Sequence, residues 1–426
     1  MYKNKLLFLV LSLLVLTQVA IGQNNTNSPY TRFGYGDIVD NNSAEQRGMG
    51  GIGIGTRSNQ SINAMNPASY SAVDSMTFMF DLGTSVLASH FSDKTIRKTT
   101  LNSNLEYITM QFPLAKWLGF SAGMLPYSFS GYNFFQNDTT YITNSSTRDN
   151  IPYTRSFVGT GGFSQVYTGI SANFFKHISV GVNAYYMFGN MANNRYLTFS
   201  NTADYTSTAQ YNSITASSFR FRYGAQFYNT FDKKHDVTLG FIYEQKAKFN
   251  GSFSKTTSGV LTDTISTAYE FEMPTVYGIG LYYTYNKKLS IAIDYTMQQW
   301  KDAKFYWSPD SLKNLENLTN RSKLAIGMEY IPNPTGRKFA DKVKYRLGFN
   351  ISDSYFKVDG VTPPKNFGVS VGVGLPLYNK ASGTVTMLNT SLEYGKIGSQ
   401  IKLQEDYLKL TLNVAFNEHW FFKRKL

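Results

Sequence analysis

The chain has 426 residues, of which 16% are aromatic, and it carries a formal net charge of +13. It has no cysteine, which excludes disulfides, thiol catalysis and thiolate metal sites. Soluble enzymes seldom contain 31 Tyr and 32 Phe, whereas outer-membrane barrels use such side chains in girdles at both membrane interfaces.

The N-terminus predicts a secretory signal peptide over residues 1–22. Lys3 and Lys5 precede an apolar run over 6–19, and Ala20-Ile-Gly22 offers a small-residue cleavage site. The alternative, an uncleaved membrane anchor, is disfavoured because the apolar run is short. An exported chain is poorly placed to bind nucleic acid. We therefore expect the basic charge to meet anionic outer-membrane lipid, lipopolysaccharide included, or an acidic protein partner.

A polar segment over 24–40 leads into a glycine-rich stretch, Arg47-Gly-Met-Gly-Gly-Ile-Gly-Ile-Gly55. Closely spaced glycines disfavour helix and strand, so the stretch predicts a compact knot of turns. Asn66-Pro67 is a turn initiator, because proline keeps the preceding residue out of the helical region. Residues 23–75 are therefore predicted to form an N-terminal hatch inside whatever the rest of the chain builds.

From residue 76 onward apolar and polar residues alternate, which is the pattern of half-buried strands. Residues 178–188, for example, place Ile178, Val180 and Tyr186 on one face and Ser179 and Asn183 on the other. Fourteen such runs are predicted, near 78–87, 104–113, 117–126, 165–175, 177–189, 218–231, 236–249, 274–285, 289–302, 321–332, 343–356, 365–376, 386–396 and 406–417. Most are about ten residues long, enough for a tilted strand to cross a bilayer.

The connections between these runs alternate between long and short. Predicted surface loops over 127–164, 190–217 and 250–273 alternate with tight turns at 113–116, 176, 232–235 and 286–288. Transmembrane barrels show this asymmetry, with short periplasmic turns and long outer loops. The sequence therefore predicts an all-β protein of the outer membrane: a fourteen-stranded antiparallel barrel over 76–426 with the hatch in its lumen.

No catalytic constellation is visible. The histidines, at 90, 177, 235 and 419, lie in or near predicted loops, and no zinc-protease, nucleophile-elbow or phosphate-loop motif occurs. Gly48 to Gly53 has the spacing Gly-x-Gly-x-x-Gly, but it follows no strand and opens no helix, as a dinucleotide site would require. We expect no enzyme activity, no metal and no cofactor.

Charged residues within the strands are predicted to point into the lumen. If Phe219, Phe221 and Tyr223 face lipid, Arg220 and Arg222 face inward. The same alternation places four more charged side chains inside: Glu244, Asp294, Glu329 and Arg346. One interpretation is a mixed-charge interior that anchors the hatch by hydrogen bonds. The other is a basic pair, Arg220 and Arg222, that orients the head group of a ligand.

The hatch resembles that of the FadL-type outer-membrane transport proteins. The resemblance is carried by Arg47-Gly-Met-Gly and by Asn66-Pro-Ala68. Its hatch residues are Gly48, Met49, Gly50, Gly51, Gly53, Asn66, Pro67 and Ala68. The lead-in Ser28-Pro-Tyr-Thr-Arg-Phe-Gly-Tyr-Gly-Asp37 and the ending Trp420-Phe-Phe-Lys-Arg424 resemble the Bacteroidetes branch of that family.

The resemblance implies passive uptake of hydrophobic small molecules, such as long-chain fatty acids, through a plugged lumen with an opening in the wall. A second branch, typified by PorV of type IX secretion, implies instead a barrel that binds protein partners in a secretion or envelope-assembly complex. The hatch of that branch reads Trp-Asn-Pro-Ala-Lys, whereas Met65 and Ser69 flank the motif here. Both functions remain as hypotheses.

Overall fold

The computed structural model describes residues 25–93, 97–144, 147–199, 206–259, 261–305, 318–358, 360–379, 384–399 and 403–419. The predicted signal peptide and residues 420–426 lie outside the described residues. No helix in the described part is long and apolar enough to cross a membrane.

Fourteen antiparallel strands pair in a closed ring, because the last strand pairs with the first of the wall. In ring order they are β2 (Thr77–Ser92), β3 (Arg97–Ala115), β4 (Leu118–Phe129), β6 (Thr147–Phe174), β7 (Ile178–Phe199), β8 (Thr208–Phe231), β9 (His235–Glu244), β12 (Val276–Tyr285), β13 (Leu289–Gln298), β14 (Arg321–Tyr330), β15 (Lys344–Ser352), β16 (Asn366–Asn379), β17 (Thr384–Ser399) and β18 (Leu403–His419). Each of the fourteen predicted runs overlaps one of these strands, although the run 236–249 extends past the end of β9 into the next strand and the run 343–356 extends past the end of β15. The predicted barrel is confirmed.

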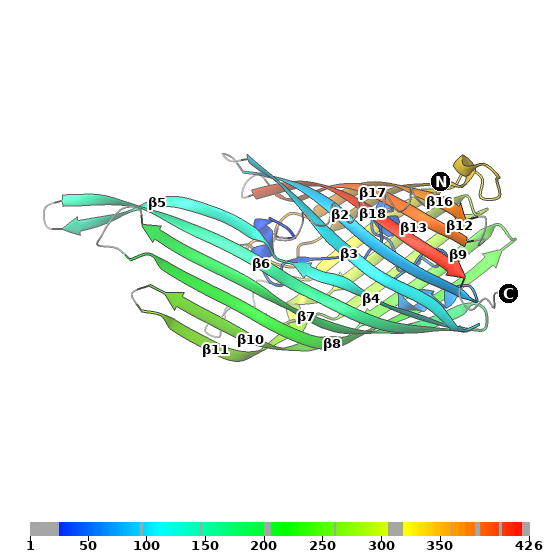
Figure 1. The fold of residues 1–426 in the computed structure, drawn as a ribbon, viewed down its shortest axis with the longest axis horizontal. Helices are drawn as coiled ribbons and strands as arrows, with labels where there is room; N and C mark the ends of the chain where they lie inside the picture. Colours follow the sequence, from blue (N-terminus) through cyan, green and yellow to red (C-terminus); the bar gives the residue numbers. More distant parts are fainter. Residues whose placement is uncertain are drawn as a thin grey trace, which may run out of the picture.

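Three predicted surface loops are wrong. Residues 127–164 contain β5 (Tyr132–Asn144), which pairs with the outer half of β6, and residues 250–273 form most of a hairpin of β10 (Ala247–Ser258) and β11 (Asp263–Met273). In the third predicted loop, 190–217, β7 continues to Phe199 and β8 begins at Thr208. Together these strands form a taller section of the barrel, here called the projecting wall, which extends beyond the rest of the barrel (Figure 1). They are rich in Thr, Ser and Asn on both faces, so they lack the apolar alternation that marks a lipid-facing strand.

The wall faces follow the predicted alternation. Phe219, Tyr223 and Tyr295 are exposed at 68%, 44% and 44%, as lipid-facing side chains should be. Of the six charged residues predicted to point inward, Arg222 is half-buried and the other five are buried: Arg220, Glu244, Asp294, Glu329 and Arg346. Moving such charges to the lipid side would cost several kcal/mol each near the membrane midplane, about 2–4 for a basic residue.

The short turns at the opposite end share one geometry. Both central residues have positive φ in the turns that contain Phe175-Lys176, Asp232-Lys233 and Asn286-Lys287. This is the type I′ turn, whose twist matches that of the strands it joins. The predicted turn at 113–116 is shifted, because β3 continues to Ala115 and the chain reverses at Lys116 and Trp117.

Candidate functional site

The hatch passes through the lumen from the outer half of the barrel to the inner end. It contains η1 (Pro29–Arg32), β1 (Asp37–Ile38), α2 (Ala44–Gly48) and η2 (Pro67–Ala72). The expectation that the glycine-rich region contains only turns is wrong for Gly48, which ends α2. That helix forms because Ser43 and Gln46 cap it reciprocally, each side chain bonding the other's backbone N–H.

Beyond α2 the chain turns through two glycines with left-handed backbone. Gly50 and Gly51 have φ of 76° and 84°, a region that side chains other than glycine adopt at a cost. A β-carbon on Gly50 would also lie 2.6 Å from the carbonyl oxygen of Phe349 in the wall. Glycine is therefore required here by both conformation and space, and the chain turns at these residues, as predicted for this stretch.

Glycines of the wall meet the hatch directly. A β-carbon on any one of them would lie under 3.0 Å from a hatch backbone atom: Gly119, Gly181, Gly240, Gly280, Gly327 and Gly348. We call this set the glycine belt. It includes residues of β4, β7, β9, β12, β14 and β15, and it lets main chain pack on main chain around much of the lumen. At these glycines the backbones of the hatch and the wall are in direct contact, with no room for a side chain between them.

Asn66-Pro67 and the residue after it hold the part of the hatch nearest the inner end of the barrel. Asn66 is fully buried, accepts from Ala68 N at 3.1 Å and donates to Ile54 O at 2.8 Å. Pro67 opens η2, where its missing N–H leaves no donor unpaired. The Ala68 carbonyl accepts from Ser171 and Ser179 of the wall at 2.8 and 2.6 Å.

Inward charges hold the hatch by hydrogen bonds. Asp294 accepts from Gly53 N at 2.6 Å and from Ile54 N at 2.7 Å. Arg346 pairs with Glu329 at 2.7 Å and with Glu45 of the hatch at 3.4 Å. These contacts confirm the interpretation of the lumen as a mixed-charge interior that anchors the hatch.

Arg220 and Arg222 share one carboxylate. Arg220 binds Glu244 at 2.7 Å, and Arg222 forms an ion pair with the other oxygen of Glu244. Arg222 also donates to Met65 O of the hatch at 3.1 Å. Both guanidinium groups therefore have partners within the protein, and a ligand head group would have to displace Glu244 to reach them.

The wall is interrupted between β3 and β4. Their pairing ends at Ile108 and Met124, although β4 continues to Phe129. The outer end of β4 pairs instead with β1 of the hatch, Phe129 opposite Asp37. In the described chain the outer half of β3, residues 97–107, pairs with β2 alone. We call this interruption the wall gap.

The inward bend of β4 depends on two glycines that its backbone approaches closely. A β-carbon on Gly162 of β6 would lie under 3.0 Å from the Ser128 carbonyl, and one on Gly36 under 3.0 Å from that of Phe129. Gly162 and Gly36 have φ of 143° and 83°. These positions allow β4 and the hatch to approach each other where a side chain would separate them.

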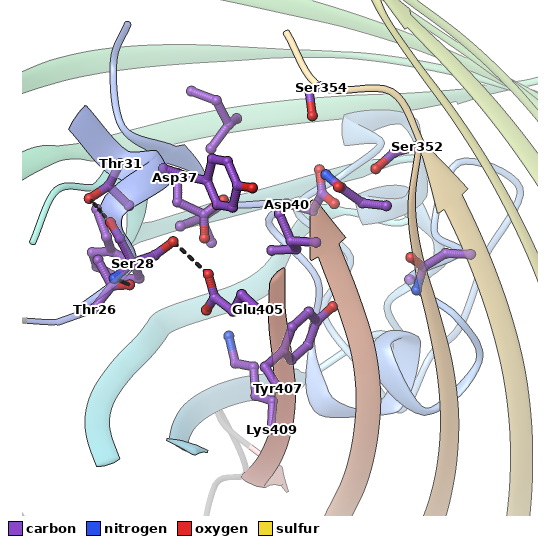
Figure 2. A pocket seen from close by; sticks show the side chains of 18 of the residues that line it. Thr26, Ser28, Thr31, Asp37, Asp40, Ser352, Ser354, Glu405, Tyr407 and Lys409 are labelled. Atoms are coloured by element: carbon purple, nitrogen blue, oxygen red, sulfur yellow. Dashed lines mark hydrogen bonds between the residues drawn. The ribbon is translucent and has the colours of Figure 1, made fainter. Parts of the chain in front are cut away.

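A cavity of about 180 Å³ lies inside the wall gap and touches Asn104 on β3 and Phe129 on β4. Figure 2 shows its polar lining, with Glu405, Tyr407 and Lys409 of β18 facing Asp37 and Asp40 of the hatch. Glu405 accepts from Ser28 at 2.5 Å and from Ser89 at 2.9 Å.

Two hatch carboxyls in this cavity differ in their partners. Burial acts to raise the pKa of Asp40, but Lys323 at 2.6 Å and Arg321 at 3.3 Å outweigh it and hold that pKa below its usual range. The carboxylate of Asp37 forms no hydrogen bond or ion pair within the described residues. The Asp37 side chain is exposed to the cavity, whereas that of Asp40 is held by its two basic partners.

Aromatic side chains fill much of the remaining outer lumen. Tyr35 of the hatch packs at 4.6 Å from Phe305 and 5.5 Å from Trp300, measured between ring centroids. Trp300 is fully buried in η3 (Trp300–Asp302). The predicted strand 289–302 is therefore too long, since it ends at Gln298 and the chain then turns inward.

The family model described as BamG matches residues 1–426. The chain belongs to the BamG family. No curated protein matches the chain.

Solved structures share the fold of this BamG-family chain at low identity. A FadL homologue of Pseudomonas aeruginosa is 12% identical, with a TM-score of 0.61 over 91% of this chain and all of that one, 100%. The Ralstonia pickettii toluene transporter TbuX is 14% identical, with a TM-score of 0.55 over 88% of this chain and 98% of its own. The Pseudomonas putida toluene transporter TodX is 12% identical, with a TM-score of 0.55 over 90% of this chain and 99% of its own. The chain thus has the fold of the FadL-type outer-membrane barrels.

The resemblance implied an opening in the wall, but sequence reasoning did not place it between β3 and β4, and it missed the residues of the cavity. A faint signal was present for the gap, because Pro126 and the Ser130-Gly131 pair interrupt the alternating pattern of β4 and β5. No comparable signal marks Asp37, Arg321 or Lys409, which lie far apart in the chain. Among the described residues, no cluster of three or more acidic or histidine side chains could hold a metal ion.

Proposed function

We propose that the barrel takes up a hydrophobic or amphipathic small molecule from the outer side and releases it sideways through the wall gap, without covalent chemistry. The observation that carries this proposal is the early end of the β3–β4 pairing, with β4 drawn inward to β1. An acyl chain partitions into lipid, so an exit in the wall avoids carrying it through the periplasm.

The chemistry of the wall gap supports an amphipathic molecule. Leu101, Leu105 and Met124 on the outer faces of its two strands are exposed at 63%, 51% and 44%. The cavity behind them is polar and charged. An apolar tail would thus lie toward the wall and a polar head toward the cavity. Buried CH₂ groups would supply most of the affinity, about 0.8 kcal/mol each.

The glycine belt supports a hatch that stays in place during uptake. Main chain packs on main chain at several strands, so moving the hatch would expose backbone and break the bonds to Asp294. We therefore propose that residues 23–75 close the direct path permanently and that solute leaves only at the wall.

Uptake of labelled long-chain fatty acids and other hydrophobic compounds tests the proposal in cells with and without the protein. Gly162→Ala is expected to displace the bend of β4 and reduce uptake at equal surface expression. Gly259→Ala is the matched control, because the nearest atom to its added β-carbon is a Thr208 side-chain oxygen at 3.3 Å. Unchanged uptake across the panel on deletion of the protein would reject the transport function.

A second candidate is a barrel that binds protein partners, as in the PorV-like branch. Exposed apolar side chains on the outer hairpins and loops favour it: Phe135 at 69%, Leu261 at 84% and Val361 at 61%. Cross-linking in native membranes tests this candidate, with Phe135→Ser and Leu261→Ser as variants. A specific cross-linked protein lost in these variants, together with unchanged uptake on deletion, would establish the partner function instead.

A further inference from the structure

The inner rim of the barrel repeats one pairing of side chains in each inner connection that the structure describes, which are four hairpin turns and the longer link 331–343. Every such connection carries an exposed aromatic residue within two positions of an exposed lysine. The pairs are Lys116 with Trp117, Phe175 with Lys176, Phe231 with Lys233, Tyr285 with Lys287, and Lys338 with Phe339. We call this set the rim pairs.

The rim pairs form a continuous arc. Backbone hydrogen bonds join neighbouring turns: Asn173 N to Trp117 O at 2.8 Å, Tyr228 N to His177 O at 2.9 Å, Asn286 N to Lys234 O at 2.6 Å, and Ile331 N to Lys288 O at 2.8 Å. The aromatic and cationic side chains are therefore held at one level around this side of the barrel.

Four of the five lysines in the rim pairs differ from the basic residues of the lumen in their partners. Within the described part of the chain, Lys116, Lys176, Lys233 and Lys287 form no ion pair. This contrasts with the lumen, where Arg220, Arg346 and Lys323 each bind a carboxylate. Their charge is thus directed outward, toward whatever surrounds the rim.

Three of these four lysines also have left-handed backbone, which is strained for a residue with a side chain. Lys176, Lys233 and Lys287 each occupy the second central position of a type I′ turn, with φ of 61°, 57° and 55°. Glycine or asparagine is favoured there, because a β-carbon destabilises left-handed backbone. A lysine in this position in three turns does not serve the turn itself. Such strain points to a role outside the fold.

We propose that the rim pairs bind the head groups of anionic phospholipids in the inner leaflet of the outer membrane. The short turns lie at the end opposite the projecting wall (Figure 1), which in transmembrane barrels is the periplasmic end. There an aromatic ring sits at the interface and a lysine beside it reaches the lipid phosphate. Phe175, exposed at 87%, is apolar surface that a lipid interface covers.

Titration of the purified full-length protein with phosphatidylglycerol tests this proposal, with bound lipid counted by native mass spectrometry. The triple variant Lys176→Gly, Lys233→Gly, Lys287→Gly is expected to bind phosphatidylglycerol about a hundredfold more weakly, since each of the three lysines near an anionic surface contributes about fivefold. Binding of phosphatidylcholine should not change. Added salt should weaken the wild-type preference, because the rim is exposed to solvent.

Two further variants separate lipid binding from folding. The glycine triple variant should melt at a higher temperature than the wild type in lipid-free detergent, because it relieves left-handed strain. The matched control Asn286→Gly should show the same direction of change with no loss of lipid affinity. The triple lysine-to-arginine variant should keep the affinity.

Two results would overturn the proposal. One is equal affinity of the wild type for the two lipids. The other is full phosphatidylglycerol binding by the glycine triple variant, even if that variant loses an acidic periplasmic protein that the wild type captures.

Discussion

Gly348 of β15 lies against Gly50 of the hatch, and a β-carbon on Gly348 would fall under 3.0 Å from the Gly50 nitrogen. Two glycines far apart in the chain therefore meet where neither can carry a side chain. Close packing of this kind makes the seating of the hatch sensitive to single methyl groups.

Gly50→Ala is expected to destabilise the folded protein by about 2–4 kcal/mol, because left-handed strain adds to a clash with the wall. Gly360→Ala is the matched control. Gly360 has the same φ of 76°, but nothing lies within 4 Å of its added β-carbon. Urea denaturation of both variants measures the difference, and equal losses would show that the wall adds no constraint at Gly50.

Asp294→Ala is expected to loosen the hatch, since the N–H groups of Gly53 and Ile54 would lose their acceptor. Leaving two buried donors unpaired costs about 2–6 kcal/mol. Asp294→Asn keeps one acceptor oxygen and should lose less. Hydrogen exchange at residues 53 and 54 reports the effect directly. Protection that survives in the alanine variant would contradict this role.

Glu244→Gln should destabilise the barrel more than the loss of an exposed ion pair. The substitution leaves Arg220 and Arg222 charged in the lumen without their carboxylate, and breaking a buried pair costs about 3–5 kcal/mol. Asp138→Asn is the control, because the Asp138–Arg155 pair is about two-fifths exposed, at 43% and 41%, and such pairs contribute about 0–1 kcal/mol. Similar melting shifts for the two variants would refute the argument.

Acid should release the segment around Asp40. The pKa of Asp40 is lower in the folded protein than in the unfolded chain, where it is about 3.9, because Lys323 and Arg321 outweigh its burial. Its contribution to stability is thus complete above about pH 4 and is lost as the pH falls through the folded pKa. Limited proteolysis near residue 40 between pH 6 and pH 2 measures this loss. Asp40→Asn should weaken that pH dependence, and an unchanged profile would assign the acid effect to other groups.

Much of the barrel could be predicted from the sequence because lipid imposes a local rule. A strand with one face in the membrane must alternate, so Ile178, Val180 and Tyr186 face outward and Ser179 and Asn183 inward wherever the strand lies in the ring. Projecting strands such as β5 and the β10–β11 hairpin escaped prediction because water on both faces imposes no such rule.

The sequence alone determined the strands that cross the membrane, the inward direction of Arg220 and Glu244, and the need for glycine near Gly50, since each follows from neighbouring residues. Tertiary structure decided which wall glycine meets which part of the hatch, that Glu244 takes both arginines, and that β4 leaves β3 to pair with β1. These outcomes join residues up to hundreds of positions apart, such as Gly50 and Gly348. They depend on the closure of the ring around the hatch, which no local pattern encodes.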